Sequence, residues 1–458
     1  MSTPYARTKA MAKEAGCKVG DLLALAPNND PYYSGSAADR AQAAWFHDLW
    51  SRFGYTSGVH LRRIHYQLVS HGDIEKHDGT PYENTDGCWK YLCGCGRHAR
   101  LLGMVNAEDF IDRRNPDPSI FMCGDVPERQ YRVTLPYGWD LLPEISTNVY
   151  CSIERPRAEI FGYDYTPEMQ PYHVEVWVEK STMDDLLRPL CARHSVNLVM
   201  GVGFMSITSV IELVNRVKRI GKPTRILYVS DFDPAGVRMP VGVARQYEFW
   251  SQALEAGDAD AKLMPIILTA KQAAEYDLPR TPIKKSDLRA GNFEAAHGEG
   301  AVELDALEAL HPGEFSRIVE NHIRQFRDPS LETRTWETYS HARKAVNAAI
   351  EEAIGFELER IGEIETDISG ILESYRDRVR DLNGELQRDL APYKDDLETL
   401  RQAIEDAIHV LHVDLPPLPT PKIVDDGDGW LFDSRRSYLE QMIRYKAHIG
   451  GCVPEVRS

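Results

Sequence analysis

The chain has 458 residues, 43% of them hydrophobic, and its 53 Lys and Arg against 70 Asp and Glu give a formal net charge of −17. This length suffices for about three domains with cores of their own, and it excludes a small scaffold held together by disulfides. Since no stretch approaches the roughly 20 apolar residues of a membrane span and the N-terminus lacks the apolar core of a signal peptide, we expect a cytoplasmic protein without a membrane partner.

The first part of the chain is polar and helical in pattern. Residues 1–40 read as an N-terminal extension, and residues 41–120 as a helical domain of the size of a DNA-binding module. Apolar residues recur at helical spacing in AADRAQAAWFHDLWSRF, HLRRIHYQLVSHG and CWKYLCGCGRHARLLG. The Pro-rich segment NPDPSI marks the end of this region, and residues 121–170 alternate weakly, as strands and connectors do.

The alternation of strands and helices is clearest in residues 171–330. Three segments read as buried strands, HVEVWVEK, NLVMGVG and TRILYVSDFD, and two as helices with Ser or Thr caps, STMDDLLRPLCARH and SITSVIELVNRVKRIGK. This βαβαβ order predicts an α/β fold with a parallel sheet, whose ligand site lies at the carboxyl ends of the strands.

A long helical tract, residues 331–412, follows. From Ile350 to Leu390 apolar residues recur about every 3.6 residues, and the stripe resumes at Leu397 after Pro392. We therefore predict two amphipathic helices that are separated at Pro392 and folded as an acidic arm or hairpin. Residues 351–406 hold 17 acidic and 7 basic side chains, so ten of the seventeen excess negative charges lie there. Residues 413–458 read as a Pro-rich linker and a C-terminal helix.

Three acidic residues stand at the predicted strand ends. Glu179 ends the first strand of the βαβαβ unit, and Asp231 and Asp233 end the third, so the fold would bring three carboxylates together. Clustered carboxylates repel one another unless a cation is present, and hard oxygen ligands suit Mg²⁺. The pattern indicates a magnesium site, although Asp231 or Asp233 could instead cap the helix that follows Pro234.

The segments VEVWVEKSTMDDLL, GVGF and RILYVSDFDPAG together resemble the Toprim domain, the magnesium-binding module of topoisomerases, primases and some nucleases. The VEK and DxDPxG motifs are similar to those of one branch of Toprim proteins. This branch comprises the A subunit of topoisomerase VI and the meiotic double-strand-break transesterase. This resemblance covers about residues 59–236. It implies a stand-alone relative of bacterial or phage type, with an N-terminal winged-helix (CAP-like) domain, a Rossmann-like Toprim domain, and here an α-helical C-terminal arm.

The resemblance also implies a nucleophile. The catalytic tyrosine of the branch lies in an R-x-I-Y-Y-type segment, and Arg62-Arg63-Ile64-His65-Tyr66 matches it, with His65 in place of the first tyrosine. Tyr66 would then attack a DNA phosphodiester and form a covalent phosphotyrosine, while Arg63 steadies the phosphate charge. A phenol with a pKa of about 10 needs a base or cation nearby to react in this way.

Further expectations follow from the same resemblance. Glu303 and Asp305, in GAVELDALEAL, match an E-x-x-A-L segment whose acid helps frame the Toprim site, although a solvated helix face explains them equally well. The cofactor would be Mg²⁺, with Mn²⁺ as a substitute, and the partners double-stranded DNA, a second copy of the chain and a separate ATPase subunit. The protein would lie with the nucleoid. No Walker A or GxGxxG motif is present, so we expect no nucleotide site on this chain.

Two groups of residues leave alternatives open. Five arginines fall in the proposed DNA-binding domain, where they could contact phosphates or form surface ion pairs: Arg62, Arg97, Arg100, Arg113 and Arg114. Cys88, Cys93, Cys95 and His98 are close enough to suggest zinc, but the spacing lacks a CxxC knuckle and the segment reads as a helix, which favours buried thiols.

The resemblance thus implies a DNA-cleaving transesterase of the type IIB topoisomerase A-subunit type. One alternative is a Toprim nuclease that hydrolyses DNA with water and forms no covalent intermediate. The other is a DNA-binding or scaffold protein without catalysis. The acidic arm would serve dimerisation, partner docking or shielding of a cationic groove.

Overall fold

The computed structural model describes the chain except for residues 1, 113–114, 123, 137, 139–150, 257–258, 285–286, 376–382 and 451–458. The chain forms two compact units. Unit 1 comprises residues 1–124, 170–328 and 423–458, and unit 2 comprises residues 125–169 and 329–422.

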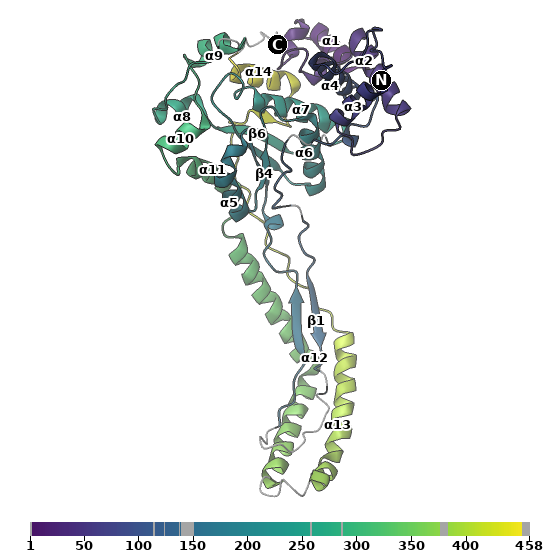
Figure 1. Cartoon of the computed structure of the whole chain (residues 1–458). Coiled ribbons are helices and arrows are strands. Elements are labelled where there is room, and N and C mark those ends of the chain that lie inside the picture. Colours follow the sequence, from purple (N-terminus) through teal and green to yellow (C-terminus); the bar gives the residue numbers. More distant parts are fainter. Residues whose placement is uncertain are drawn as a thin grey trace. The chain divides into compact units, whose positions relative to one another are not determined.

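Unit 1 is built on a five-stranded sheet with the order β4-β3-β5-β6-β7. Figure 1 labels β4 and β6 of this sheet. The first four strands in this order are parallel and β7 pairs antiparallel to β6, so the expected α/β class with a mostly parallel sheet is confirmed. The strands are β3 (His173–Val178), β4 (Asn197–Met200), β5 (Thr224–Val229), β6 (Ala261–Ile267) and β7 (Phe432–Asp433).

Helices cover both faces of this sheet. One face packs against α5 (Asp184–His194), α10 (Leu304–Leu310) and α11 (Glu314–Gln325), and the other against α6 (Ile207–Ile220), α7 (Met239–Ala253) and α14 (Tyr438–His448). In β3, Val174, Val176 and Val178 enter the first core and Trp177 the second, and all six residues of this strand are buried. Burial on both faces explains why these strands read as nearly continuous apolar runs.

Short helices α8 (Ala270–Glu275) and α9 (Ala290–His297) follow β6 in the chain. Helix α6 is capped at both ends by residues that the sequence pattern indicates. Ser206 accepts a hydrogen bond from the Ser209 amide at the start of this helix, and Gly221 ends it in the left-handed conformation.

The N-terminal part of unit 1 is helical. It contains α1 (Pro4–Glu14), α2 (Ala37–Arg52), α3 (Leu61–His71) and α4 (Asp86–Leu101), and the last three share a core with Phe46, Ile64 and Leu92 at its centre. The three predicted helices are thereby confirmed. Among the described residues of this part, strand-like pairing is limited to isolated bridges, namely Val59–Phe110 and Glu75–Pro81 within the part and Ser119–Leu198 to β4, so its winged-helix form stays a prediction.

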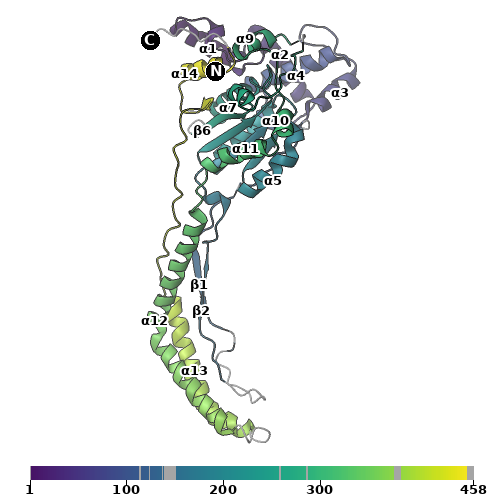
Figure 2. The ribbon, with the colours of Figure 1, turned by 90° about the vertical axis from the view of Figure 1, so that its left-hand side faces the viewer.

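Unit 2 combines a strand pair with two helices (Figure 2). The antiparallel strands β1 (Gln130–Thr134) and β2 (Arg157–Phe161) pack with α12 (Leu331–Tyr375) and α13 (Asn383–His409) around one apolar core. The two helices run antiparallel, since Arg360 pairs with Asp396 and Tyr375 donates to Asp389. The apolar stripe of the sequence supplies this core.

The position of the helix break differs from the prediction. Pro392 lies inside α13 on an exposed position and does not separate two helices, and α12 ends at Tyr375. An exposed proline removes one hydrogen bond from the ladder, and a helix held by an apolar core on its other face tolerates that loss. The two-helix arrangement itself is as predicted.

In the described part of the chain, no helix combines the length and the apolar character that crossing a bilayer requires.

Candidate functional site

The parallel sheet brings the predicted acids together. Glu179 directly follows β3 and Asp231 follows β5, its direct neighbour in the sheet, so both lie at the carboxyl edge. Both side chains are buried, at 7% and 5% exposure. Asp231 Oδ1 accepts a hydrogen bond from the Leu304 amide at 2.7 Å, which fixes this carboxylate in place.

The ionised form of the Glu179 carboxyl group is disfavoured by its surroundings. Burial, and next the charges of Asp231 and Asp233, raise its pKa well above the usual range. Among the described residues, Glu179 Oε2 finds no hydrogen-bond donor. A buried carboxyl oxygen without a donor, beside two further carboxylates, is a place where a cation would be stabilised.

Asp233 has a structural role in the turn after β5. Its Oδ1 accepts from the amides of Ala235 at 2.8 Å and Gly236 at 2.5 Å. Gly236 is required there, because a Cβ would stand 2.0 Å from the Asp231 carbonyl oxygen. Helix α7 starts only at Met239, so Asp233 caps the turn and not the helix.

Lys180 lies among the acids, and its role was not foreseen from the sequence. Its ammonium is 2.8 Å from Asp231 Oδ2 and 3.4 Å from Asp305 Oδ2, and it also donates to Glu303. Burial opposes its charge, but Asp231 and Glu303 outweigh burial and raise the pKa of Lys180. The sequence feature that could have indicated this role is the position of Lys180 directly after Glu179, in the VEK segment.

Glu303 and Asp305 therefore join the site through Lys180. Glu303 occupies the residue before α10, and both carboxylates are more than half exposed. Their contact with Lys180 argues for a place at the edge of the acidic cluster and against a freely solvated helix face. The strand ends, the turn at Asp233 and the start of α10 thus form one acidic site, which we call the carboxylate site: Glu179, Lys180, Asp231, Asp233, Glu303 and Asp305.

The carboxylate site offers the hard oxygen donors that Mg²⁺ prefers, including the donor-free Glu179 Oε2. Within the described ranges, however, no group of three or more His, Cys, Asp or Glu side chains stands in a metal-holding arrangement. The ammonium of Lys180 offsets part of the carboxylate charge in this geometry. The donor chemistry fits a divalent cation, and its binding would require the carboxylates to turn toward a common point.

Tyr66 lies on α3 and is exposed. Its side chain is 54% exposed, and its ring lies 5.3 Å from that of His65. Arg63, also exposed, lies on the same helix. No interaction between Tyr66 and the carboxylate site is found in the part of the chain that the structure describes, so a single chain does not join the two.

The histidines near Tyr66 have structural partners. His65 is buried and hydrogen-bonded to Tyr82 at 2.7 Å and Asn84 at 3.3 Å. His60 caps α3, where its Nδ1 accepts from the Arg62 amide at 3.1 Å.

The arginines of the N-terminal part differ in environment. Arg62 is exposed and lies over the Trp89 ring, whereas Arg100 is buried over the Phe110 ring. Arg97 is half-buried and donates to the Asn28 carbonyl. Arg113 and Arg114 lie outside the described residues.

The cysteines of α4 behave as ordinary thiols. Burial raises the pKa of Cys93 to about 11 and that of Cys95 to about 12, which keeps both protonated at neutral pH. Neither belongs to a metal-holding group in the described ranges.

Neither a family model nor a curated protein matches this chain.

Proposed function

We propose that the chain is a DNA-cleaving transesterase of the type IIB topoisomerase A-subunit type. One observation carries the proposal: a parallel sheet brings Glu179 and Asp231 to one edge, where burial and mutual repulsion prepare them for a cation. In this interpretation the sheet of unit 1 is a Toprim domain and the helices α2 to α4 are the core of a CAP-like DNA-binding domain.

The proposed reaction is an exchange of phosphoesters. The Tyr66 oxygen attacks the phosphorus of a DNA phosphodiester, and the bond from phosphorus to one sugar oxygen breaks as the bond to tyrosine forms. The phenol proton passes to the sugar oxygen, which leaves as a hydroxyl. The number of phosphoester bonds is unchanged, so the step needs no nucleotide, oxidant or reductant.

Glu179, Asp231 and Asp233 would hold Mg²⁺ or Mn²⁺, which supplies positive charge to the phosphate as it becomes more negative. Arg63, exposed two residues N-terminal to His65, is placed on the same helix as Tyr66 to contact a phosphate oxygen. Lys180 holds Asp231, Glu303 and Asp305 close together by its own charge.

Among the described residues, Tyr66 has no contact with the carboxylate site of its own chain, and this supports a homodimer in which the tyrosine of one copy meets the carboxylates of the other. The family resemblance implies the same arrangement. It also implies that strand passage depends on a separate ATPase subunit.

The test is cleavage of supercoiled plasmid with Mg²⁺ or Mn²⁺, stopped with detergent and analysed with and without protease. We expect linear DNA that enters the gel only after proteolysis and is lost in Tyr66→Phe. Tyr33→Phe is the matched control, since Tyr33 is a partly exposed tyrosine of unit 1 that packs on Tyr5. Linear product from Tyr66→Phe would contradict the proposal.

A second candidate, a Toprim nuclease that uses water, is favoured by the same separation of Tyr66 from the acids. It predicts cutting that ignores both protease treatment and Tyr66→Phe but is lost in Asp231→Asn.

A third candidate, a DNA-binding or scaffold protein without catalysis, is favoured by the Lys180 ammonium, which already offsets carboxylate charge. It predicts that Asp231→Asn changes neither cleavage nor DNA binding.

A further inference from the structure

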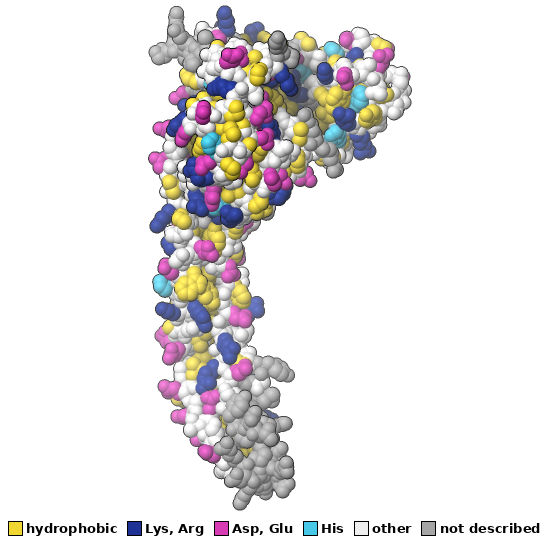
Figure 3. Space-filling model, turned by 60° about the vertical axis from the view of Figure 1, so that its left-hand side comes forward, with side chains coloured by type: hydrophobic (Ala, Val, Ile, Leu, Met, Phe, Trp, Pro, Cys, Tyr) yellow, Lys and Arg dark blue, Asp and Glu magenta, His cyan; other side chains and the backbone are white. Residues whose placement is uncertain are grey.

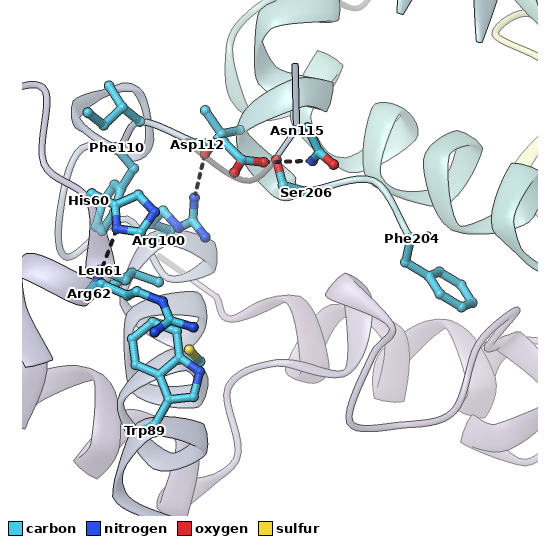
Figure 4. Close-up of a pocket in the computed structure, with 13 residues that line it drawn as sticks. His60, Leu61, Arg62, Trp89, Arg100, Phe110, Asp112, Asn115, Phe204 and Ser206 are labelled. Atoms are coloured by element: carbon cyan, nitrogen blue, oxygen red, sulfur yellow. Dashed lines mark hydrogen bonds between the residues drawn. The ribbon is translucent and has the colours of Figure 1, made fainter. Parts of the chain in front are cut away.

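A cavity of about 620 Å³ opens in unit 1 between helices α3, α4 and α6 (Figure 4). Two guanidinium groups line it, Arg62 from α3 and Arg100 from α4, and the start of α6 lines the opposite side with Ser206 and Thr208. The carboxylate site does not contribute to this lining, so the cavity is a separate feature of the unit.

Arg100 is the buried cation of this cavity. The side chain is 8% exposed, and its guanidinium lies 4.6 Å from the centre of the Phe110 ring. Nη1 reaches Thr208 Oγ1 only at 3.4 Å, and Nε finds no acceptor among the described residues. A buried guanidinium with incomplete pairing is costly, and an anion in the cavity would offset that cost.

The charge balance of the cavity is positive. Burial lowers the pKa of Arg100 only to about 10, so the group stays charged at neutral pH, and Asp112 is the carboxylate in the lining. Asp112 Oδ2 accepts a hydrogen bond from Asn115 at 2.7 Å. Burial raises the pKa of the Cys93 thiol to about 11, which leaves it neutral. Two guanidinium groups therefore face one carboxylate.

The helix α6 adds to this positive character. It has 14 residues, and its first turn begins at Ser206, whose side chain accepts from the Ser209 amide at 3.1 Å. The positive end of the helix dipole and the free amides of a first turn favour anions. This end of α6 and the buried Arg100 are independent features that both select a negative group.

Arg62 connects the cavity to the face of α3 that carries Tyr66. Its guanidinium lies 5.2 Å from the centre of the Trp89 ring, which orients it, and the side chain remains exposed. Residues four apart in a helix share one face, so Arg62 and Tyr66 are neighbours on α3. On the far rim, Phe204 stands apart from the other lining residues (Figure 4) and is 48% exposed.

We propose that this cavity binds a phosphate group of a DNA strand, next to the phosphodiester that Tyr66 attacks. Arg62, Arg100 and the start of α6 contact the phosphate oxygens, and Phe204 offers an apolar surface to the neighbouring sugar or base. The location beside the cleaved bond rests on the proposed function. A free mononucleotide carries the same phosphate chemistry, and the experiment separates the two sources.

The test measures equilibrium binding of a short labelled duplex in EDTA, where no cleavage occurs, over a series of salt concentrations. We expect Arg62→Gln to raise Kd about tenfold and to lower the log–log salt slope by about 1. Arg62→Lys keeps the charge and should keep the slope. Arg52→Gln is the matched control, because Arg52 is also an exposed arginine over an aromatic ring, at 5.5 Å from Phe53, but lies outside the cavity.

Equal affinities and slopes for Arg62→Gln and Arg52→Gln would overturn the proposal. Thymidine monophosphate and inorganic phosphate, added as competitors, should displace the duplex only near millimolar concentrations. Displacement by micromolar thymidine monophosphate that is lost in Arg62→Gln would overturn the assignment to a strand and favour a free nucleotide.

The plasmid assay separates this proposal from the proposed function. Arg62-dependent duplex binding without any cleavage would support the phosphate site and contradict the transesterase. Tyr66-dependent cleavage with unaltered binding by Arg62→Gln would do the reverse.

Discussion

At the scale of single residues, Arg245 joins three separate parts of unit 1. Its guanidinium is fully buried between the rings of Tyr32 and Tyr438, at 4.0 and 4.6 Å from their centres. Its Nε lies 3.2 Å from both oxygens of Asp30, and Nη1 lies 2.9 Å from Glu248. The contact holds the N-terminal segment, α7 and α14 together.

Removing one partner of this buried network should destabilise unit 1 strongly. Asp30→Ala leaves the Arg245 charge buried and undercompensated, and we expect a loss of about 3 kcal/mol in the free energy of unfolding. Chemical denaturation measures the loss. Asp48→Ala, at an exposed position on α2, should change stability by less than about 0.5 kcal/mol. Equal effects of the two variants would contradict the assigned role of Asp30.

His448 on α14 makes stability depend on pH. Burial, and then the charges of His297 and Arg444, lower its pKa to about 4, against the opposing contact with the Val237 main chain. The unfolded chain therefore binds more protons between pH 6.5 and 4, so stability is full above about pH 6.5 and falls as the pH falls toward 4.

The expected change on going from pH 7 to pH 5 is a loss of about 2 kcal/mol from this group. His448→Leu should remove that part of the pH dependence, as measured by denaturation at both pH values. His47→Leu, at a half-exposed position on α2, is the control and should leave the dependence as in the wild type. A steeper loss of stability toward low pH in His448→Leu would contradict this role of His448.

Lys180 offers a test of the cation site that does not depend on catalysis. Lys180→Met removes the ammonium that offsets the charges of Asp231, Glu303 and Asp305, so Mg²⁺ should stabilise this variant more than the wild type. For the wild type, Mg²⁺ at about 100 times its Kd should add about 2.7 kcal/mol. Thermal unfolding with Mg²⁺ or EDTA measures both. Lys90→Met, at an exposed position on α4, is the control. No Mg²⁺ effect in any variant would contradict a cation site.

At the scale of elements, the sequence predicted the βαβαβ unit because its signals are local. Apolar runs of strand length alternate with helices that carry their own caps, such as Ser206 and Gly221 in α6. Parallel pairing then follows, and with it the meeting of Glu179 and Asp231. The role of Lys180 was out of reach, because its partners Glu303 and Asp305 lie more than 120 residues away in the chain.

The helices of unit 2 also show that local sequence patterns do not predict the effect of packing between distant segments. The apolar stripe predicts two amphipathic helices, but the predicted break at Pro392 is wrong, because this residue lies inside α13. Proline disfavours a helix locally, yet the buried residues on the other face of α13, among them Leu390, Leu397 and Ile404, hold it together. Local propensity is thus overruled by packing that the sequence pattern alone does not weigh.

The core of unit 2 should respond to a cavity at its centre. Ile364 on α12 is fully buried, and Ile364→Ala should cost about 3 kcal/mol. Hydrogen exchange should rise in peptides from α12 and α13, with little change in the strands of unit 1. Phe356→Ala is the control, because Phe356 is 75% exposed on the same helix and its loss should cost little. Equal exchange in the two variants would contradict this core.

At the scale of the whole molecule, the chain returns to its starting unit. Residues 423–458 rejoin unit 1, where β7 adds an antiparallel edge strand to β6 and α14 packs on the sheet. A two-residue strand has no sequence signature, so this return could not be predicted from the pattern.

The negative charge is unevenly distributed along the chain. Outside residues 351–406, the chain has 46 basic and 53 acidic side chains. Figure 3 shows acidic and basic side chains interspersed on the visible face of unit 2.

The proposed dimer predicts that two inactive variants complement each other. Tyr66→Phe and Asp231→Asn, each unable to cleave alone, should regain cleavage of at least one strand when mixed and allowed to exchange subunits. The reason is that one of the two composite sites in the mixed dimer combines an intact tyrosine with intact carboxylates. Sedimentation should show a dimer for each variant. Dimers without restored cleavage would contradict sites shared between copies.

In the proposed reaction, Tyr66 becomes covalently attached to DNA under the control of the carboxylate site. The most direct measurement is mass spectrometry of the digested protein after incubation with DNA and Mg²⁺. We predict a peptide with nucleotide phosphate on Tyr66, present in the wild type and absent from Glu179→Gln and from samples with EDTA. Cleaved DNA together with only unmodified Tyr66 would contradict the transesterase and favour hydrolysis by water.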